Sequence, residues 1–332
     1  MSESGDYTPS SQWQGHDFTA ARAAFDTHAG RSYAVAQEKG LTASKLLPLS
    51  ITTDSEYPAV IDTDFTGSMS GWDATIFSKF PYLDHELTTE YLGKGVEISF
   101  GAICDQEDTY PLQIRDFAEG ANMKEKMEEL VHAGGGSGPG NNCEAHGLAA
   151  LYRSRNTNMP KALVKPVYII ITDEMGYNLV SVDTAKKLAK VTINQSMSIV
   201  EIFEELKEKY AVYLVIKPYG SEKLLGDKLP PTTQKVYDFW EKVVGADHIA
   251  LLPNPDRVVD VIFGIFAKET GRIGYFRKEL EQRQLPDKGG KEKVETVYKS
   301  LETIHKLPAP SGNPTDSKTK GLGGGKVAKS LI

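Results

Sequence analysis

The sequence has little cysteine and no long apolar run. Its two cysteines, Cys104 and Cys143, cannot build a disulfide framework, and neither stands in the Cys-x-x-Cys pair that is typical of zinc sites. No stretch approaches the ~18 uninterrupted apolar residues that a membrane span needs. The first residues also lack the basic and then apolar pattern of a secretory signal. We therefore expect a soluble, cytoplasmic protein with reduced thiols.

Positive charge is also scarce. The chain has 38 Lys and Arg against 45 Asp and Glu, which gives a formal net charge of -7. Such a chain does not attract a polyanion, and its basic residues are scattered except over the last twenty positions. We therefore expect neither nucleic acid nor a membrane as a partner.

The middle of the chain alternates strand-like and helix-like segments. This order predicts an α/β fold, doubly wound, with a mainly parallel central sheet between helices. The segment 167–172 is apolar throughout, as a central strand covered on both faces should be. The predicted strands are 59–63, 96–104, 167–172, 212–217 and 249–252. The predicted helices are 73–91, 122–133, 143–155, 183–190, 198–210, 232–244 and 256–269.

The two ends of the chain differ from this middle part. Residues 1–55 read as a loose polar arm followed by an amphipathic helix that starts at Phe18. One domain over 56–270 matches the usual size of an α/β fold. Residues 271–307 carry a second amphipathic pattern, which predicts a C-terminal helical extension. Residues 308–332 are rich in Lys and Gly, and we expect a disordered tail there.

Polar side chains cluster directly after the first predicted strand. Asp64, Thr66 and Ser68 alternate there, so one carboxylate and two hydroxyls can face a common point. Hard oxygen donors at short spacing, without His or Cys, suit Mg²⁺ or Mn²⁺ rather than zinc. Neutral hydroxyls leave much of the metal charge uncompensated, which favours a carboxylate from a second molecule at an open coordination position. The segment therefore predicts a metal site that binds an acidic partner.

The segment 64–69 resembles the Asp-x-Ser-x-Ser signature of the metal-ion-dependent adhesion site (MIDAS) in von Willebrand factor A-type (VWA) domains, with Thr66 in place of a Ser. The segment 169–174 is similar to the family's strand-Thr-Asp-Gly element, with Glu174 where Gly is usual. The resemblance covers about 56–270 and implies a Rossmann-like VWA fold. It also implies that Thr66 and Ser68 ligate the metal directly, while Asp64 and Asp173 act through water or hold the hydroxyls.

The second metal loop departs from the family pattern. Where the family supplies a Thr, the chain has a glycine-rich segment over 134–145. Asn141, Asn142 or Ser137 could provide an oxygen ligand, and the sequence does not choose among them. Ser137 and Trp72, which follows the metal loop, are also candidates for contact with the partner, although a single Trp near a helix start is often packed locally.

The resemblance implies a protein-protein interaction module rather than an enzyme. Intracellular members of the family often work with AAA+ ATPases of the MoxR kind, which makes an adaptor for such an ATPase one implied role. Two alternatives remain open from the residues. One is a metal-assisted hydrolase or a nucleotide-binding enzyme that uses the 134–140 loop, although no catalytic base stands at a suitable spacing. The other is a structural assembly subunit that docks through its terminal helices.

Several residues near this segment also have plainer interpretations. Asp64, Thr66 and Ser68 could form an Asx or Ser turn that caps the following helix. Asp105, Glu107 and Asp108 follow a strand and could lie near the metal face, although such acids usually form a solvated turn. The segment with Cys143, Glu144 and His146 reads as a buried thiol, a carboxylate at a helix N-terminus and a surface imidazole.

Overall fold

A six-stranded sheet forms the centre of the computed structural model, which describes residues 13, 15–26, 33–132, 142–224 and 228–306. Its strand order is β12 (Ile249–Leu251), β11 (Ala211–Ile216), β7 (Val167–Thr172), β2 (Tyr57–Asp64), β3 (Val96–Ile103) and β4 (Leu112–Ile114). Every neighbouring pair is parallel except β3 and β4. The predicted α/β fold with a mainly parallel sheet is therefore confirmed, and the short antiparallel β4 is an addition to it.

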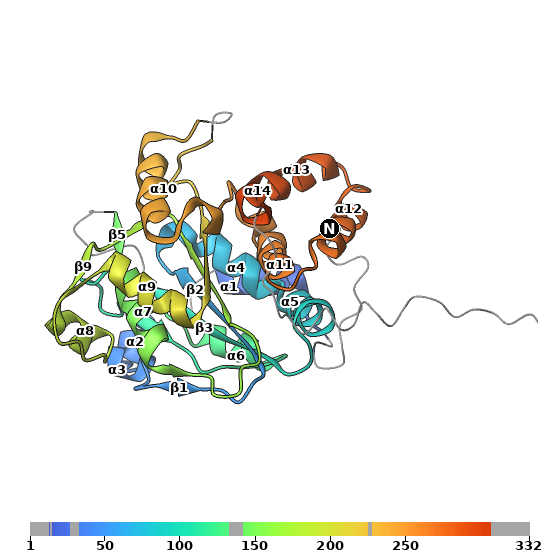
Figure 1. Cartoon of the computed structure of the whole chain (residues 1–332). Helices are drawn as coiled ribbons and strands as arrows, with labels where there is room; N and C mark the ends of the chain where they lie inside the picture. Colours follow the sequence, from blue (N-terminus) through green and yellow to red (C-terminus); the bar gives the residue numbers. More distant parts are fainter. Residues whose placement is uncertain (1–12, 14, 27–32, 133–141, 225–227, 307–332) are drawn as a thin grey trace, which may run out of the picture.

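Helices cover both faces of this sheet (Figure 1). Alternate residues of one strand supply the two cores, so that Val60 packs in one and Ile61 in the other. The Val60 face is covered by α7 (His146–Arg155), α8 (Val182–Leu188), α9 (Ile199–Lys209) and α10 (Pro231–Val244). The Ile61 face is covered by α1 (Phe18–Asp26), α4 (Ser70–Ser78), α5 (Phe80–Glu86), α6 (Asn122–Glu128) and α11 (Val258–Glu269).

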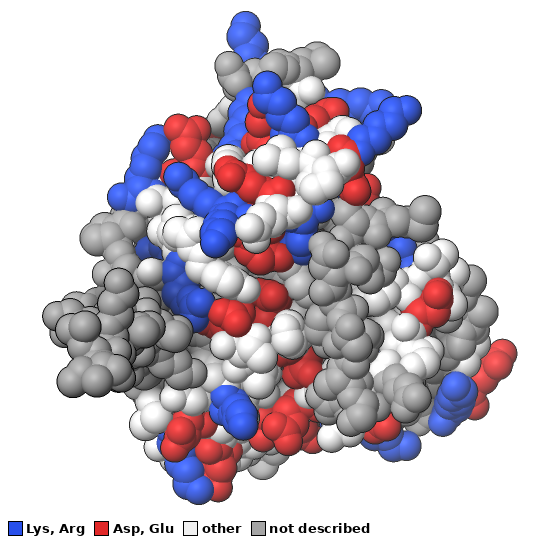
Figure 2. All heavy atoms as spheres, turned by 90° about the vertical axis from the view of Figure 1, so that its right-hand side faces the viewer, with Lys and Arg blue, Asp and Glu red and all other residues white. Residues whose placement is uncertain are grey.

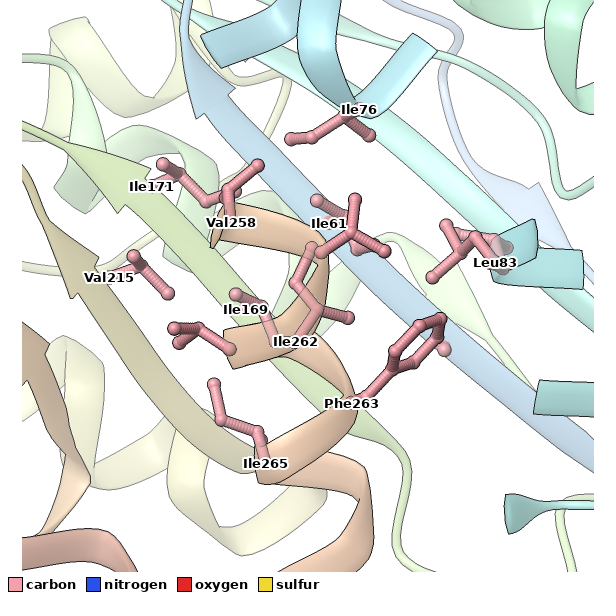
Figure 3. Packing of buried hydrophobic residues seen from close by; sticks show 14 of the residues in the cluster. Ile61, Ile76, Leu83, Ile169, Ile171, Val215, Val258, Ile262, Phe263 and Ile265 are labelled. Atoms are coloured by element: carbon pink, nitrogen blue, oxygen red, sulfur yellow. The ribbon is translucent and has the colours of Figure 1, made fainter. Parts of the chain in front are cut away.

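Helix α11 lies directly against the Ile61 face (Figure 3). It is buried from Val258 to Lys268, because the sheet covers one side and the C-terminal helices cover the other. Its Gly264 faces Leu301, and a Cβ added at this glycine would overlap the Leu301 side chain. The glycine thus permits a close helix contact that any larger residue would prevent.

The C-terminal helices share the core of the main domain. They are α12 (Ile273–Gln284), α13 (Gly290–Ser300) and α14 (Glu302–His305). Phe276, Val297 and Ile304 are each fully buried in the same cluster as α11. The predicted helical extension is present, and it packs as part of this core. The expected tail at 308–332 lies outside the described residues.

Some predicted helices differ from the observed elements. The segment 73–91 forms α4, α5 and the π-helix η3 (Leu87–Tyr91), because Pro81 near the start of α5 cannot continue a helix from α4. The helix expected from 143 begins at His146, since β5 (Cys143–Glu144) pairs with β8 (Met175–Gly176). The amphipathic N-terminal segment contains α1 and then α2 (Tyr33–Glu38), with residues between them that are not described.

The remaining elements are short. Helix α3 (Ala43–Leu46) precedes β1 (Ile51–Thr52), which pairs with β6 (Thr157–Asn158). β9 (Leu179–Val180) pairs with β10 (Met197–Ser198). The 3-10 turns are η2 (Gly67–Met69), η4 (Ala246–His248) and η5 (Pro255–Arg257).

A buried ion pair joins the central strand to the helix above it. Asp62 of β2 and Arg153 of α7 are both fully buried. Arg153 Nε donates to Asp62 Oδ2 at 3.0 Å, and its Nη2 donates to Oδ1. Tyr168 OH donates to Asp62 Oδ2 at 2.6 Å, and Arg153 Nη1 donates to Ser99 Oγ at 2.7 Å. Gly101 leaves room for this carboxylate, because a Cβ there would overlap Asp62 Oδ1.

Breaking this pair should destabilise the protein strongly. In Asp62→Ala the Arg153 guanidinium stays buried without its carboxylate, so the free energy of unfolding should fall by about 3–5 kcal/mol in urea denaturation. The double variant Asp62→Ala/Arg153→Met should lose less than the sum of the two single variants, because it removes both charges. A loss below about 1 kcal/mol for Asp62→Ala would contradict this role of the pair.

Glu86 at the end of α5 is buried against α12. Its side chain accepts a 3.3 Å hydrogen bond from Tyr275 OH. Burial raises the pKa of Glu86 to about 7, and the neighbouring carboxylate Glu279 adds to the rise while Arg283 opposes it. A carboxyl whose pKa is raised by folding stabilises the fold in its protonated form, so its contribution is present below pH ~4.5 and is lost as the pH rises through about 7.

Glu86→Gln should therefore stabilise the protein above neutral pH. The gain in the free energy of unfolding over wild type should grow between pH 5 and pH 8 toward about 2–3 kcal/mol, because glutamine carries no charge to desolvate. Urea denaturation at several pH values measures this gain. The exposed Glu208→Gln serves as a control and should show no such trend. A gain for Glu86→Gln that does not change with pH would contradict the assignment.

Candidate functional site

The candidate site lies where the strand order reverses. From β2 the chain passes to β3 on one side and later returns to β7 on the other side of β2. In open α/β sheets, ligands bind beyond the carboxyl ends of the two strands at such a switch point. Asp64 is the last residue of β2, and Asp173 directly follows β7. The topology therefore brings these two carboxylates to one edge of the sheet.

Asp64 is fully buried and is held by hydroxyl and amide groups. Its Oδ1 accepts hydrogen bonds from the Thr66 amide at 3.0 Å and from Thr66 Oγ1 at 2.7 Å. Thr172 Oγ1 lies 3.5 Å from its Oδ2. The Asx turn that the sequence left open is thus present. The helix cap is not, because α4 has Met69 as its N-cap and no side-chain hydrogen bond there.

Asp173 is held by a lysine from the neighbouring strand. It is 1% exposed, and Lys217, which directly follows β11, forms an ion pair with Asp173 Oδ2. The Gly220 amide donates to the same oxygen at 3.1 Å. The loop after β11 therefore covers this carboxylate, and its Lys217 places a positive charge next to it.

Acidic groups exceed basic groups around the two aspartates. Burial raises the pKa of Asp64, and the nearby Asp173 raises it further. Burial and Asp173 also raise the pKa of Glu174 to about 7. Burial raises the pKa of Glu144 to about 12, with Asp64 as the largest charged contributor. Glu144 therefore keeps its proton at neutral pH, and one of its oxygens, Oε2, is buried without a hydrogen-bond partner.

The structure describes only some of the predicted metal ligands. Asp64, Thr66 and Asp173 lie at the same sheet edge, where Asn142 also lies, since its carbonyl accepts from the Met175 amide at 3.0 Å. The Asn142 side-chain oxygen accepts a 2.7 Å hydrogen bond from Tyr219 OH. The side chain of Ser68, together with Ser137, Asn141 and the whole 134–140 loop, lies outside the described residues. Among the described residues, no three His, Cys, Asp or Glu side chains are arranged to hold a metal ion.

Trp72 does not reach the surface. It is 2% exposed and packs in the core of the Ile61 face. Its position in the first turn of α4 turns the indole toward the sheet, which buries a large apolar area. The prediction that Trp72 contacts a partner is therefore wrong, and local packing explains this residue.

Other residues near this edge also differ from expectation. His146 is fully buried rather than exposed, with Nε2 3.1 Å from Thr172 Oγ1. Burial lowers its pKa to about 3, so the imidazole is neutral. Cys143, expected as a buried thiol, is partly exposed. Asp105 and Asp108 are 6% and 8% exposed, so they do not form the solvated turn that was expected.

An aromatic stack forms at the loop that carries Asp64 and Thr66. The Phe65 ring stacks on His132 with centroids 3.9 Å apart and an interplanar angle of 16°. Phe25 of α1 meets both rings edge-on, at 6.3 Å and 6.0 Å. The N-terminal helix thus packs against the loop that carries Thr66, beside its hydrogen bond to Asp64.

Sequence reasoning missed Lys217, misjudged Glu144 and left the position of Asp105 open between the metal face and a solvated turn. Lys217 ends an apolar strand, and a charged residue at that position was a usable signal, because strand ends gather at one edge. Glu144 was assigned to the helix dipole, but the parallel pairing of β5 with β8 places it beside Glu174. Asp105 follows β3 and accepts a 2.9 Å hydrogen bond from Tyr177 OH, a contact between residues 72 positions apart that no local pattern predicts.

No family model and no curated protein sequence matches this chain. Among solved structures, the pilus adhesin SpaC from Lactobacillus rhamnosus GG in its open conformation is similar over 75% of this chain and 31% of the adhesin, with 9% identity and a TM-score of 0.42. A second SpaC structure matches at 10% identity over 75% of this chain and 32% of the adhesin, also with a TM-score of 0.42. This chain thus corresponds to about a third of the adhesin, and a likeness at this level carries no argument about function. Within the described residues, no helix has the length and apolarity to cross a membrane.

Proposed function

We propose that the residues at the carboxyl ends of β2 and β7 bind Mg²⁺ or Mn²⁺ and, through the metal, an acidic residue of a protein partner. The observation that carries this proposal is the meeting of Asp64, with the Thr66 hydroxyl bound to it, and Asp173 at the switch point of the sheet. Their oxygens are the hard donors that these cations prefer. The buried and unpartnered Glu144 oxygen adds a further oxygen at the same edge.

The electrostatics of the edge favour a divalent cation. Burial and the nearby Asp173 raise the cost of ionising Asp64, and a bound positive charge removes that cost. When bound, the cation would supply Lewis-acid attraction for one more oxygen ligand. Asp64 and Asp173 would hold it, the Thr66 hydrogen bond orients the Asp64 carboxylate, and the surrounding core excludes water.

The partner is proposed from the same chemistry. A carboxylate is the side chain that best completes a hard cation whose protein ligands are partly neutral. The VWA-like pattern of 64–69 and Asp173 supports the MIDAS assignment, and it supports an adaptor role toward an AAA+ ATPase of the MoxR kind as one form of this interaction.

Calorimetric titration with Mg²⁺ and Mn²⁺ tests the metal site. Wild type should bind either cation, and Asp64→Ala should bind at least about tenfold more weakly, because the variant loses both a carboxylate and the hydrogen-bond acceptor of Thr66. Asp54→Ala provides the matched control, since this aspartate is 68% exposed and pairs with Lys161. Equal affinity in wild type and Asp64→Ala would remove the basis of the proposal.

Affinity capture with the full chain, with and without a chelator, tests the partner. The captured protein should be lost on chelation and with Asp64→Ala, and retained with Asp54→Ala. Purified partner then binds in a metal-dependent manner, and replacing its contacting Asp or Glu by Asn or Gln abolishes binding. A partner that binds equally in chelator contradicts the metal-mediated contact.

Lys217 competes with a metal for Asp173, because both are cations that neutralise the same carboxylate. Lys217→Met should therefore bind Mg²⁺ more tightly, by about tenfold, since it removes a positive charge next to the site. Lys223→Met, an exposed lysine of the same loop, should leave the affinity unchanged. Weaker Mg²⁺ binding by Lys217→Met, in a variant shown to be folded by circular dichroism, would contradict this competition.

A further inference from the structure

A basic cavity lies away from the acidic residues at the carboxyl ends of β2 and β7. It has a volume of about 520 Å³, within the usual range of small-molecule sites. Its walls come from α1, the end of α4, the turn η5 and one face of α13. Figure 2 looks onto the side of the molecule that carries α12 and α13, where Lys and Arg side chains lie in several groups with acidic residues between them. The lining residues are Arg22, Lys79, Asn254, Asp256, Arg257, Lys288, Gly289, Glu292, Lys293 and Thr296.

Positive charge dominates this cavity although the chain as a whole is acidic. Five lining residues are Lys or Arg, and two are Asp or Glu. Three of the five cations already pair with a carboxylate: Arg22 with Asp256 at 3.2 Å, Arg257 with Asp260 at 2.9 Å and Lys293 with Asp287 at 3.2 Å. The five cations still outnumber the four carboxylates beside them, which are Asp256, Asp260, Asp287 and Glu292, and this excess attracts anions. A concave wall strengthens that attraction because it keeps water away from part of the ligand.

Two of these cations have buried side chains in the wall of the cavity. Lys79 is 7% exposed and Arg257 is 5% exposed. Lys79 Nζ donates to the Asp256 carbonyl at 2.9 Å, and Arg257 Nη1 donates to Asp260 at 2.9 Å. Both side chains are thus held in place before any ligand arrives, which lowers the entropic cost of binding.

Helix α13 adds to the positive potential. Gly289, Glu292, Lys293 and Thr296 are spaced at three and four residues, so a single helix face lines the cavity. The helix begins there with Gly289 in a left-handed conformation (φ 77°) and no side-chain cap. The positive end of its dipole therefore faces the same space as the lysines.

We propose that this cavity binds a small ligand with two or more phosphate groups. Lysine ammonium groups and the planar Arg257 guanidinium are the usual protein partners of phosphate oxygens. The cavity brings several cationic donors to one space, which a ligand with more than one phosphate group can contact, and the polar lining offers little to an apolar molecule. The site shares no residue with the acidic edge, so this binding is independent of the metal.

Calorimetry on the full chain in chelator tests the proposal with pyrophosphate, ATP and inorganic phosphate as probes. Pyrophosphate should bind with a dissociation constant below about 1 mM, and inorganic phosphate at least about tenfold more weakly. Tighter binding of ATP than of pyrophosphate indicates a phosphate ester as the ligand, and equal binding indicates recognition of the phosphates alone. No binding of either polyphosphate, or equal binding of inorganic phosphate, overturns the proposal.

Two double variants that remove the same charge distinguish binding in the cavity from general electrostatic attraction of the ligand to the protein surface. Lys288→Gln/Lys293→Gln removes two lysines that line the cavity, and pyrophosphate should bind at least about tenfold more weakly. Lys291→Gln/Lys299→Gln removes two exposed lysines of α13 that do not line the cavity. The affinity of this control variant for pyrophosphate should stay within about threefold of wild type. An equal loss in both double variants would overturn the site.

Discussion

The ion pair between Asp62 and Arg153 is the constraint on which the central part of the structure depends. A carboxylate in the middle of a buried strand is tolerated only with a partner of opposite charge. Arg153 is that partner, and it holds α7 over β2 at a defined register. Glu144 lies just before α7, so the same pair also positions the Glu144 carboxyl beside Asp64.

Two aspartates of one strand thus have different roles. Asp62 and Asp64 are two residues apart and project to the same face of β2. Asp62 meets a guanidinium and is structural, whereas Asp64 meets hydroxyls, amides and other acids at the end of the strand. The unbalanced acidity lies at the switch point, where an α/β sheet binds its ligands. The basic cavity shares no residue with this acidic group, so the molecule carries two regions of opposite charge.

Much of the fold could be predicted because its signals are local. Five strands of the sheet were predicted with both ends within two residues, since each contains mainly apolar residues over the length that a buried strand needs. The three residues of β4 are too few for such a pattern. The segment 73–91 was predicted as one helix although it contains three elements, because periodicity continues across Pro81. The helix 143–155 was predicted too long, because its first residues pair with β8 instead. Trp72 was misjudged because proximity to a loop in sequence says nothing about which side of a helix faces the core.

The sequence by itself determined the α/β class and the sharing of one sheet edge by Asp64 and Asp173, because parallel strands place their carboxyl ends together. Tertiary structure alone decided that Lys217 neutralises Asp173, that His146 is buried, and that α1, α4, η5 and α13 enclose a basic cavity. The physical reason is that strand and helix periodicity is written in neighbouring residues. The partner of a side chain depends instead on how distant elements pack across the sheet.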